Sequence, residues 1–200
     1  TLVSSDIVEI HYLGKAVNTQ TPSTGTVTLD MLSASGTKSS STFLRGDNTF
    51  ASAGGDNTPA FLLLSSGNTS ISDNTWTKLT FGTETLDTDS ACSTSRFTVP
   101  SGEGGYYQIS FSMNMGGTTD GQGNYVQYKL YKNGSEQSGF GVSFNGNPGT
   151  VIEEADLSFS GLINLAASDY LEVYGRMDVA SGAITTNTGH FSGFKLIGVS

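Results

Sequence analysis

The stretch that decides the fold is Gly105-Tyr-Tyr-Gln-Ile-Ser-Phe-Ser-Met-Asn-Met115. From Tyr107 onward, apolar and polar residues alternate one by one, which is the period of a β-strand with one buried face. We therefore predict a half-buried strand here, with Ile109 and Phe111 on its core side. The polar residues Gln108 and Ser110 belong to the opposite face.

The same alternation recurs through residues 58–200. It appears in Trp76–Phe81, Arg96–Val99, Val126–Leu130, Leu157–Ile163, Leu171–Gly175 and Phe194–Leu196. We predict that Val126 and Leu130 join Ile109 and Phe111 in the core, and that Phe194 and Leu196 form an apolar face opposite Lys195. Lys132-Asn-Gly-Ser135 carries the Asn-Gly signal of a tight hairpin turn. So many short strands predict an all-β, two-sheet jelly-roll sandwich.

Composition supports this fold class and excludes several functions. The chain has 26 Gly, and 14% of its residues are charged, against a typical ~25%, so amphipathic helices are disfavoured. The net charge is −9 without a basic cluster, so we expect no nucleic-acid partner. A lone Cys92 excludes an internal disulfide and a Cys-rich zinc site. No apolar run approaches the ~20 residues of a membrane-spanning helix, so we expect no membrane insertion.

The N-terminal part differs from the rest. Residues 1–16 contain one alternating segment, Val8 to Tyr12, which we interpret as the terminal strand of an upstream β domain. The start lacks an initiator Met and signal-peptide features, so we expect the chain to begin inside a larger gene product. Residues 17–57 hold few apolar residues, including Phe43 and Phe50. Three parallel copies could bury these on a shared axis, which predicts a trimeric stalk; the alternative is a flexible linker. Residues 58–200 form the predicted jelly-roll head.

Two resemblances give this organisation a name. Phe97-Thr-Val-Pro and Gly105-x-Tyr-x-Ile-x-Phe111 resemble the signature of the globular head of complement first-component q subunits, which share their jelly roll with tumour necrosis factor. Leu165–Val173 resembles a later stretch of that family, with Ser168 where the family has Gly. This resemblance covers roughly residues 60–200 and implies the same jelly-roll fold.

Ser39–Ala51, which contains Thr-Phe-Leu-Arg-Gly-Asp-Asn-Thr-Phe, resembles a segment found just before the tips of phage tail fibres. This resemblance implies the C-terminal part of a phage tail or head fibre protein, a homotrimer with a stalk and a knob at the virion surface. A host cell-surface receptor and, through an upstream region, other virion structural proteins would be its partners.

Candidate site residues follow from loops and outward aromatic residues. The loops Gly116–Asn124 and Asn145–Thr150 are rich in Gly and Asn, which suit ligand contact, although they also suit ordinary turns. Our receptor-binding candidates are Asn124, Tyr125, Asn145 and Asn147. Phe43, Phe50, Tyr106, Tyr131 and Tyr174 are our candidates for the trimer interface. Outward tyrosines could instead stack on sugar rings.

Catalytic and metal motifs are not evident. His11 and His190 lie far apart in sequence, and Cys92 has no neighbouring base, so we predict a protein that is not an enzyme. Arg45-Gly-Asp47 is interpreted as a turn rather than an integrin ligand. Asp87 and Asp89 are the residues we consider for Ca²⁺, but two carboxylates fall short of the ~6–8 oxygen ligands this ion takes. A solvated turn is the preferred interpretation, and no cofactor is expected.

These observations lead to two functional hypotheses. The first is a virion fibre tip that attaches to a host receptor, such as a surface glycan, without catalysis. The alternative is a structural capsid decoration or head-fibre knob with no host ligand. A cellular surface adhesin or spore-coat trimer is a third interpretation.

Overall fold

The computed structural model describes residues 33–52, 57–65, 69–117, 123–146, 154–179 and 184–198, with residues 3, 31 and 152. The chain divides into two compact units, Thr1–Ala53 and Gly54–Ser200, and each is described by itself. The strand expected within residues 1–16 lies outside the described residues, as does most of 17–32. No helix in the described part of the chain has the length and hydrophobicity needed to cross a membrane.

Unit 1 contains a short antiparallel hairpin. Strand β1 (Thr42–Leu44) pairs with β2 (Phe50–Ser52), and Phe43 lies opposite Ala51. The connection is closed by a hydrogen bond from the Arg45 N–H to the Thr49 carbonyl at 2.8 Å. The Asp47 carboxylate accepts hydrogen bonds from the Thr49 N–H and hydroxyl. The Arg-Gly-Asp tripeptide thus forms part of a tight turn, as the sequence indicates.

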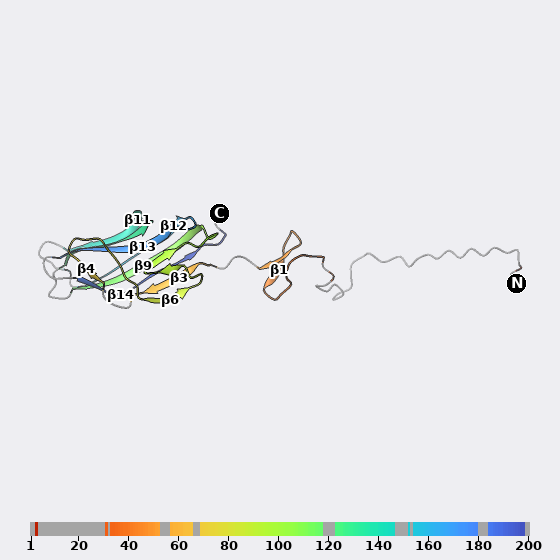
Figure 1. The fold of residues 1–200 in the computed structure, drawn as a ribbon, viewed down its shortest axis with the longest axis horizontal. Coiled ribbons are helices and arrows are strands. Elements are labelled where there is room, and N and C mark those ends of the chain that lie inside the picture. Colours follow the sequence, from red (N-terminus) through yellow and green to blue (C-terminus); the bar gives the residue numbers. More distant parts are fainter. Residues whose placement is uncertain are drawn as a thin grey trace. The chain divides into compact units, whose positions relative to one another are not determined.

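Unit 2 is a sandwich of two antiparallel sheets (Figure 1). Its strands are β3 (Ala60–Leu64), β4 (Ser70–Ile71), β5 (Thr77–Lys78), β6 (Thr83–Asp87), β7 (Cys92–Ser93), β8 (Arg96–Thr98), β9 (Gly105–Gly117), β10 (Gly123–Lys132), β11 (Ser135–Asn145), β12 (Glu154–Leu165), β13 (Tyr170–Val179) and β14 (Ile184–Lys195).

The first sheet has the order β12-β9-β14-β3-β6, with β4 also pairing with β14. The second sheet has the order β11-β10-β13-β8-β7, with β5 also pairing with β13. Strands distant in sequence are therefore neighbours in both sheets, and successive strands of the chain repeatedly cross between them. This order is that of a jelly roll, and the fold class predicted from the sequence is confirmed.

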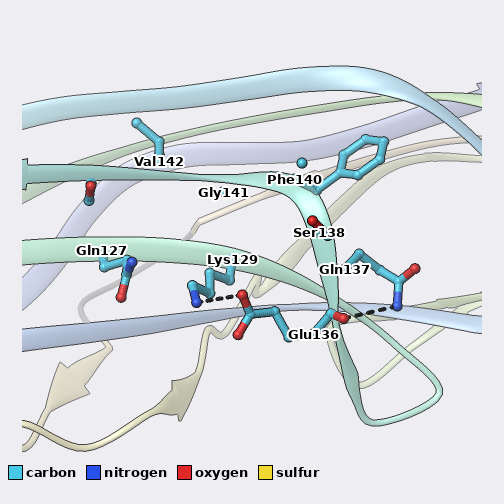
Figure 2. Close-up of a pocket in the computed structure, with 10 residues that line it drawn as sticks. Gln127, Lys129, Glu136, Gln137, Ser138, Phe140, Gly141 and Val142 are labelled. Atoms are coloured by element: carbon cyan, nitrogen blue, oxygen red, sulfur yellow. Dashed lines mark hydrogen bonds and ion pairs between the residues drawn. The ribbon is translucent and has the colours of Figure 1, made fainter.

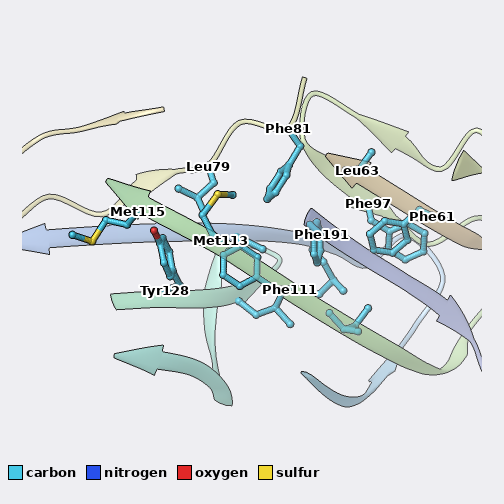
Figure 3. Packing of buried hydrophobic residues seen from close by; sticks show 14 of the residues in the cluster. Phe61, Leu63, Leu79, Phe81, Phe97, Phe111, Met113, Met115, Tyr128 and Phe191 are labelled. Carbon is cyan, nitrogen blue, oxygen red and sulfur yellow. The ribbon is translucent and has the colours of Figure 1, made fainter. Parts of the chain in front are cut away.

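The core lies between the two sheets, where the predicted faces meet (Figure 3). Ile109, Phe111, Val126 and Leu130 are all fully buried, as predicted. Aromatic rings fill much of the space: Phe61 stacks on Phe97 with centroids 4.4 Å apart, and Phe111 meets Tyr128 edge-on at 5.2 Å. Burying side chains of this size contributes about 1.5–3 kcal/mol each.

The predicted turn between β10 and β11 is also confirmed. Asn133 and Gly134 have φ values of 52° and 77°, and Lys132 lies opposite Ser135. Positive φ at both central residues is the geometry that Asn-Gly supplies in tight hairpins, because its twist matches that of the flanking strands.

The prediction for the last strand is wrong in its phase. Phe194 is 37% exposed, whereas Phe191 is fully buried, and Lys195 reaches the Glu103 carboxylate at 2.8 Å. The inward position nearest to Phe194 is Gly193. A Cβ there would lie 2.7 Å from Ile109 and 2.8 Å from Phe61, so the core accepts only glycine at this position.

Candidate functional site

The outward face of the first sheet is uncharged over its central strands. Direct neighbours across the ladder form rows, such as Ser160, Ser110 and Ser192 on β12, β9 and β14. We define the serine face by the outward residues Ser158, Ser160, Leu162, Gln108, Ser110, Ser112, His190, Ser192, Phe194, Ala60, Leu62 and Leu64. None of these is Asp, Glu, Lys or Arg.

Apolar side chains stand on this face among the serines. Leu162 and Phe194 flank Gln108 in one row of the ladder, and they are 56% and 37% exposed. Tyr106 is also exposed on β9, next to this row. Exposed apolar side chains can mark an interaction surface, and charged residues are depleted at the centre of protein–protein interfaces.

The outward face of the second sheet has the opposite character. We define the cationic–aromatic face by Trp76, Lys78, Arg96, Lys129, Tyr131, Tyr170, Glu172, Tyr174 and Arg176. The Arg96 guanidinium lies 3.9 Å from the centroid of the Tyr170 ring, and the Lys129 ammonium lies 5.2 Å from that of Trp76. The centroids of the Tyr131 and Tyr174 rings are 4.3 Å apart. Cations over aromatic faces are attracted by the ring quadrupole, so these side chains hold one another in place.

A buried carboxylate anchors this face. Glu172 is 3% exposed, and it accepts hydrogen bonds from Lys78 Nζ at 2.7 Å and Arg96 Nε at 2.9 Å. Burial alone would raise the pKa of Glu172, but the hydrogen bonds and charges of Lys78 and Arg96 together hold this pKa below its usual value. Glu172 is therefore ionised at neutral pH. Burial and the Glu172 charge raise the pKa of Tyr174.

The structure separates the tyrosines predicted for the trimer interface. Tyr131 and Tyr174 come together on the cationic–aromatic face, whereas Tyr106 belongs to the outward side of the first sheet. Phe43 and Phe50 lie in unit 1, where Phe43 is 60% exposed and Phe50 is half-buried. The interface role of all five stays a prediction.

Three of the receptor-binding candidates gather at one end of the second sheet. Tyr125 on β10 lies opposite Asn145 on β11, and Asn124 donates a hydrogen bond to the Asp178 carboxylate at 3.2 Å. The Tyr125 hydroxyl donates to the Gln127 side-chain oxygen at 2.8 Å. Residues 118–122 of the first candidate loop and 147–150 of the second, Asn147 among them, lie outside the described residues. The binding role of these residues also stays a prediction.

The carboxylates considered for Ca²⁺ have turn-forming partners. The Asp87 carboxylate accepts hydrogen bonds from the N–H groups of Ala91 and Cys92, at 2.8 and 2.9 Å. The Asp89 carboxylate accepts one from the Thr88 hydroxyl at 2.6 Å. Across the described ranges, no group of three or more His, Cys, Asp or Glu side chains is arranged to hold a metal ion.

The single thiol is not poised for nucleophilic chemistry. Cys92 is half-buried and free. Burial, followed by the negative charges of Asp87 and Glu84, raises its pKa to about 12. A thiol needs a lowered pKa to act as a nucleophile near neutral pH. His190 lies on the serine face opposite Ser112 and Leu64, and His11 is outside the described residues.

Sequence reasoning missed a hollow beside β11. Its lining residues come from β10 and β11, and its volume is about 260 Å³. Lys129, one of its lining residues, is also the residue whose ammonium lies over the Trp76 ring. One signal was available: Ser138-Gly-Phe-Gly141 places glycines inside a strand pattern, and an isolated glycine there indicates a bulge.

Among the comparisons with known proteins, only the comparison with solved structures finds matches. No protein-family model matches the chain, and no curated relative matches it significantly. The chain is similar to the globular domain of the zebrafish complement 1qA protein, at 17% identity over 70% of this chain and 98% of that one, with a TM-score of 0.48. It is also similar to murine APRIL in a crystal structure at pH 5.0, at 12% identity over 68% of this chain and 98% of that one, with a TM-score of 0.48.

Proposed function

We propose that this chain is the knob-bearing end of a homotrimeric phage fibre at the virion surface, which attaches the particle to a host receptor without catalysis. The observation that carries this proposal is the contrast between the two outward faces of unit 2. The serine face is uncharged and partly apolar, with Glu154 and Asp156 farther along β12, and the other face is rich in aromatic and cationic side chains.

The serine face is the surface that neighbouring copies would cover. In a chain of net charge −9, copies repel one another wherever their acidic surfaces meet. Serine, alanine and leucine side chains avoid that repulsion and allow two backbones to approach closely. Burying Leu162 and Phe194 would also supply a hydrophobic contribution to assembly.

Threefold assembly also accounts for unit 1. Its hairpin leaves Phe43 largely exposed in a single chain, and a shared axis would give this ring neighbours from the other copies. In such a trimer the cationic–aromatic face stays on the outside. This arrangement keeps Tyr106, Phe43 and Phe50 as interface candidates and gives up Tyr131 and Tyr174. The knob then presents three copies of that face toward a receptor-bearing surface.

The test begins with the oligomeric state. Light scattering of the purified chain should give three times the mass of one chain. Replacing both Ser110 and Ser192 with Arg places two charges at the centre of the serine face, and this variant should be monomeric with an unchanged β circular dichroism spectrum. Ser101→Arg, at an exposed turn position, should remain trimeric. A monomeric wild-type chain would overturn the assembly on which the proposal depends.

Adsorption tests the second half of the proposal. A fluorescently labelled trimer should bind saturably to cells of some strains in a bacterial panel, and the monomeric variant should bind more weakly because it loses avidity. A trimer that adsorbs to none of the strains, yet binds to capsid particles, would replace attachment with the decoration hypothesis.

A further inference from the structure

A bulge in β11 opens the second sheet at one place. Lys129 on β10 lies opposite Gly141, but Tyr131 lies opposite Glu136. The ladder thus advances two residues along β10 and five along β11, and residues 137–140 are skipped by the register. Gly139 has a φ of +87°, and no heavy atom lies within 4 Å of the place its Cβ would take. The skipped residues therefore bow away from β10 into open space.

The bow leaves a hollow of about 260 Å³ between the two strands. Figure 2 shows Gln127, Lys129 and Glu136 on one side of the β11 ribbon, with Phe140 and Val142 on the other. Phe140 packs edge-on against Phe159 of β12, with centroids 6.4 Å apart, and its ring occupies the space above Gly161. The bulge is thereby anchored to the edge of the first sheet, so the hollow has a fixed wall.

The hollow offers hydrogen-bond donors and acceptors without a net charge. Lys129 and Glu136 form an ion pair, and the other polar side chains include the Gln127 amide and the hydroxyls of Ser138 and Ser143. Residues skipped at a bulge also lose their ladder partners, which leaves peptide N–H and C=O groups for a ligand. A neutral set of this kind suits a molecule covered in hydroxyl groups, each of which both donates and accepts.

An apolar wall completes the hollow. Phe140 and Val142 line it from β11, and both are half-buried. A pyranose ring has hydroxyls at its edge and an apolar C–H face, so it needs both polar groups and an apolar neighbour. The volume of about 260 Å³ has room for one such ring.

We propose that this hollow, with Phe140 and Val142 as its apolar wall, binds one uncharged terminal sugar residue of a host-surface glycan. The inference rests on the proposed function, in which the second sheet faces outward from the threefold axis. It moves the centre of the site from the loops around Asn124 and Asn145 to the bulge. The hydrogen bond from Tyr125 to Gln127 links the two regions, so a longer glycan could extend toward the loops.

The experiment measures binding of simple sugars to the intact chain. Saturation-transfer NMR with the methyl glycosides of glucose, galactose, mannose and N-acetylglucosamine should detect at least one ligand, with a dissociation constant in the millimolar range. Ser143→Trp places a large ring in the hollow from an exposed position, and Gln127→Ala removes one polar group. We expect at least tenfold weaker binding in the first variant and a smaller loss in the second.

The matched control is Ser101→Trp, which adds the same ring at an exposed turn position that does not line the hollow and should bind as wild type. Equal binding by wild type and Ser143→Trp, with both folded by circular dichroism, would overturn the proposal. Binding of glucuronic or sialic acid glycosides alone would overturn it too, because the hollow would then select a charge.

The two proposals fail in different ways. If the wild-type trimer adsorbs to cells and Ser143→Trp adsorbs equally well, the sugar site is wrong while the attachment function stands. If the isolated chain binds a glycoside through this hollow but the trimer adsorbs to no strain, the sugar site stands and the attachment function is wrong.

Discussion

The Arg96 guanidinium and the Glu172 carboxylate are joined by two contacts of 2.9 Å, through Nε and through a terminal nitrogen. The pair links β8 to β13 on the cationic–aromatic face. Lys78 from β5 binds the same carboxylate oxygen. The buried charge of Glu172 on β13 therefore holds β5 and β8 in register beside it. Removing this charge should lower the free energy of unfolding.

Replacing Glu172 with Gln keeps the shape of the side chain and removes its charge. Charged hydrogen bonds of this kind contribute about 1.5–3 kcal/mol, and the partly exposed cations reduce that, so we expect a loss of about 1–2 kcal/mol at pH 7. The folded pKa of Glu172 lies below the usual value for a glutamate. The carboxylate's contribution is thus present above that value and is lost as the pH falls through the folded pKa.

Urea denaturation of wild type and Glu172→Gln at a series of pH values from neutral to strongly acidic measures this difference. The gap between the two free energies of unfolding should close at the acidic end. Two curves that stay parallel over the whole range would show that Glu172 does not titrate as described.

Replacing Phe111 with Ala should destabilise unit 2 by about 3–5 kcal/mol, because a fully buried ring leaves a cavity when it is removed. Phe111 lies between Tyr128 and Phe159. Phe144→Ala, at an exposed position on β11, is the control and should cost less than about 1 kcal/mol. Thermal melts at one fixed chain concentration compare them, since assembly makes stability concentration-dependent. Equal melting temperatures for the two variants would contradict the packing shown in Figure 3.

Cys92 should resist alkylation in the folded protein. Its pKa of about 12 leaves almost no thiolate at pH 8, and the thiolate is the reactive form. Mass spectrometry after treatment with iodoacetamide should show an unmodified folded chain and a fully modified chain in denaturant. Rapid, stoichiometric modification of the folded chain at pH 8 would contradict the burial of this thiol.

Replacing Ser168 with Gly should stabilise the turn before β13. Ser168 has a φ of +71°, a conformation that is strained for residues with a Cβ. Hydrogen bonds from Ala166 and Asn133 to Asp169 fix the turn on either side, so the strain has no means of relaxing. Relief of strain exceeds the added chain entropy of glycine, and we expect a gain of about 0.5–1 kcal/mol.

The neighbouring substitution Ala167→Gly serves as the control for Ser168→Gly. Ala167 has no positive φ, so glycine there adds chain entropy without relieving strain and should destabilise slightly. Denaturant midpoints measure both variants. A loss of stability in Ser168→Gly as large as that in Ala167→Gly would show that the strain argument is wrong.

The sequence predicted the strands and their buried faces wherever apolar side chains occupied the inward positions. The alternation from Tyr107 to Met115 located the central strand, and Asn133-Gly134 located the hairpin. The signal failed at Gly193, because a core position filled by the rings and methyl groups of its neighbours holds a residue with no side chain. Phe194 then appeared to be the apolar member of the pair.

The surfaces were less accessible to prediction, because they depend on which strands become neighbours. The serine rows exist only after β9 is placed between β12 and β14, and nothing local to Ser110 indicates Ser192 beside it. Lys129 and Trp76 meet only because β5 and β10 both pair with β13. The tyrosines were recognised as outward, but their sheets were not, and this is why Tyr106 was grouped with Tyr131 and Tyr174.

The place where the chain enters unit 2 has a mechanical consequence. The first strand of the unit, β3, is hydrogen-bonded on both sides, to β14 along Ala60–Leu64 and to β6 along Phe61–Leu64. Tension directed along β3 would load both ladders in shear, so that their hydrogen bonds must break together instead of unzipping in turn. A domain that held a particle to a cell in flow would need that resistance at the strand through which the load arrives.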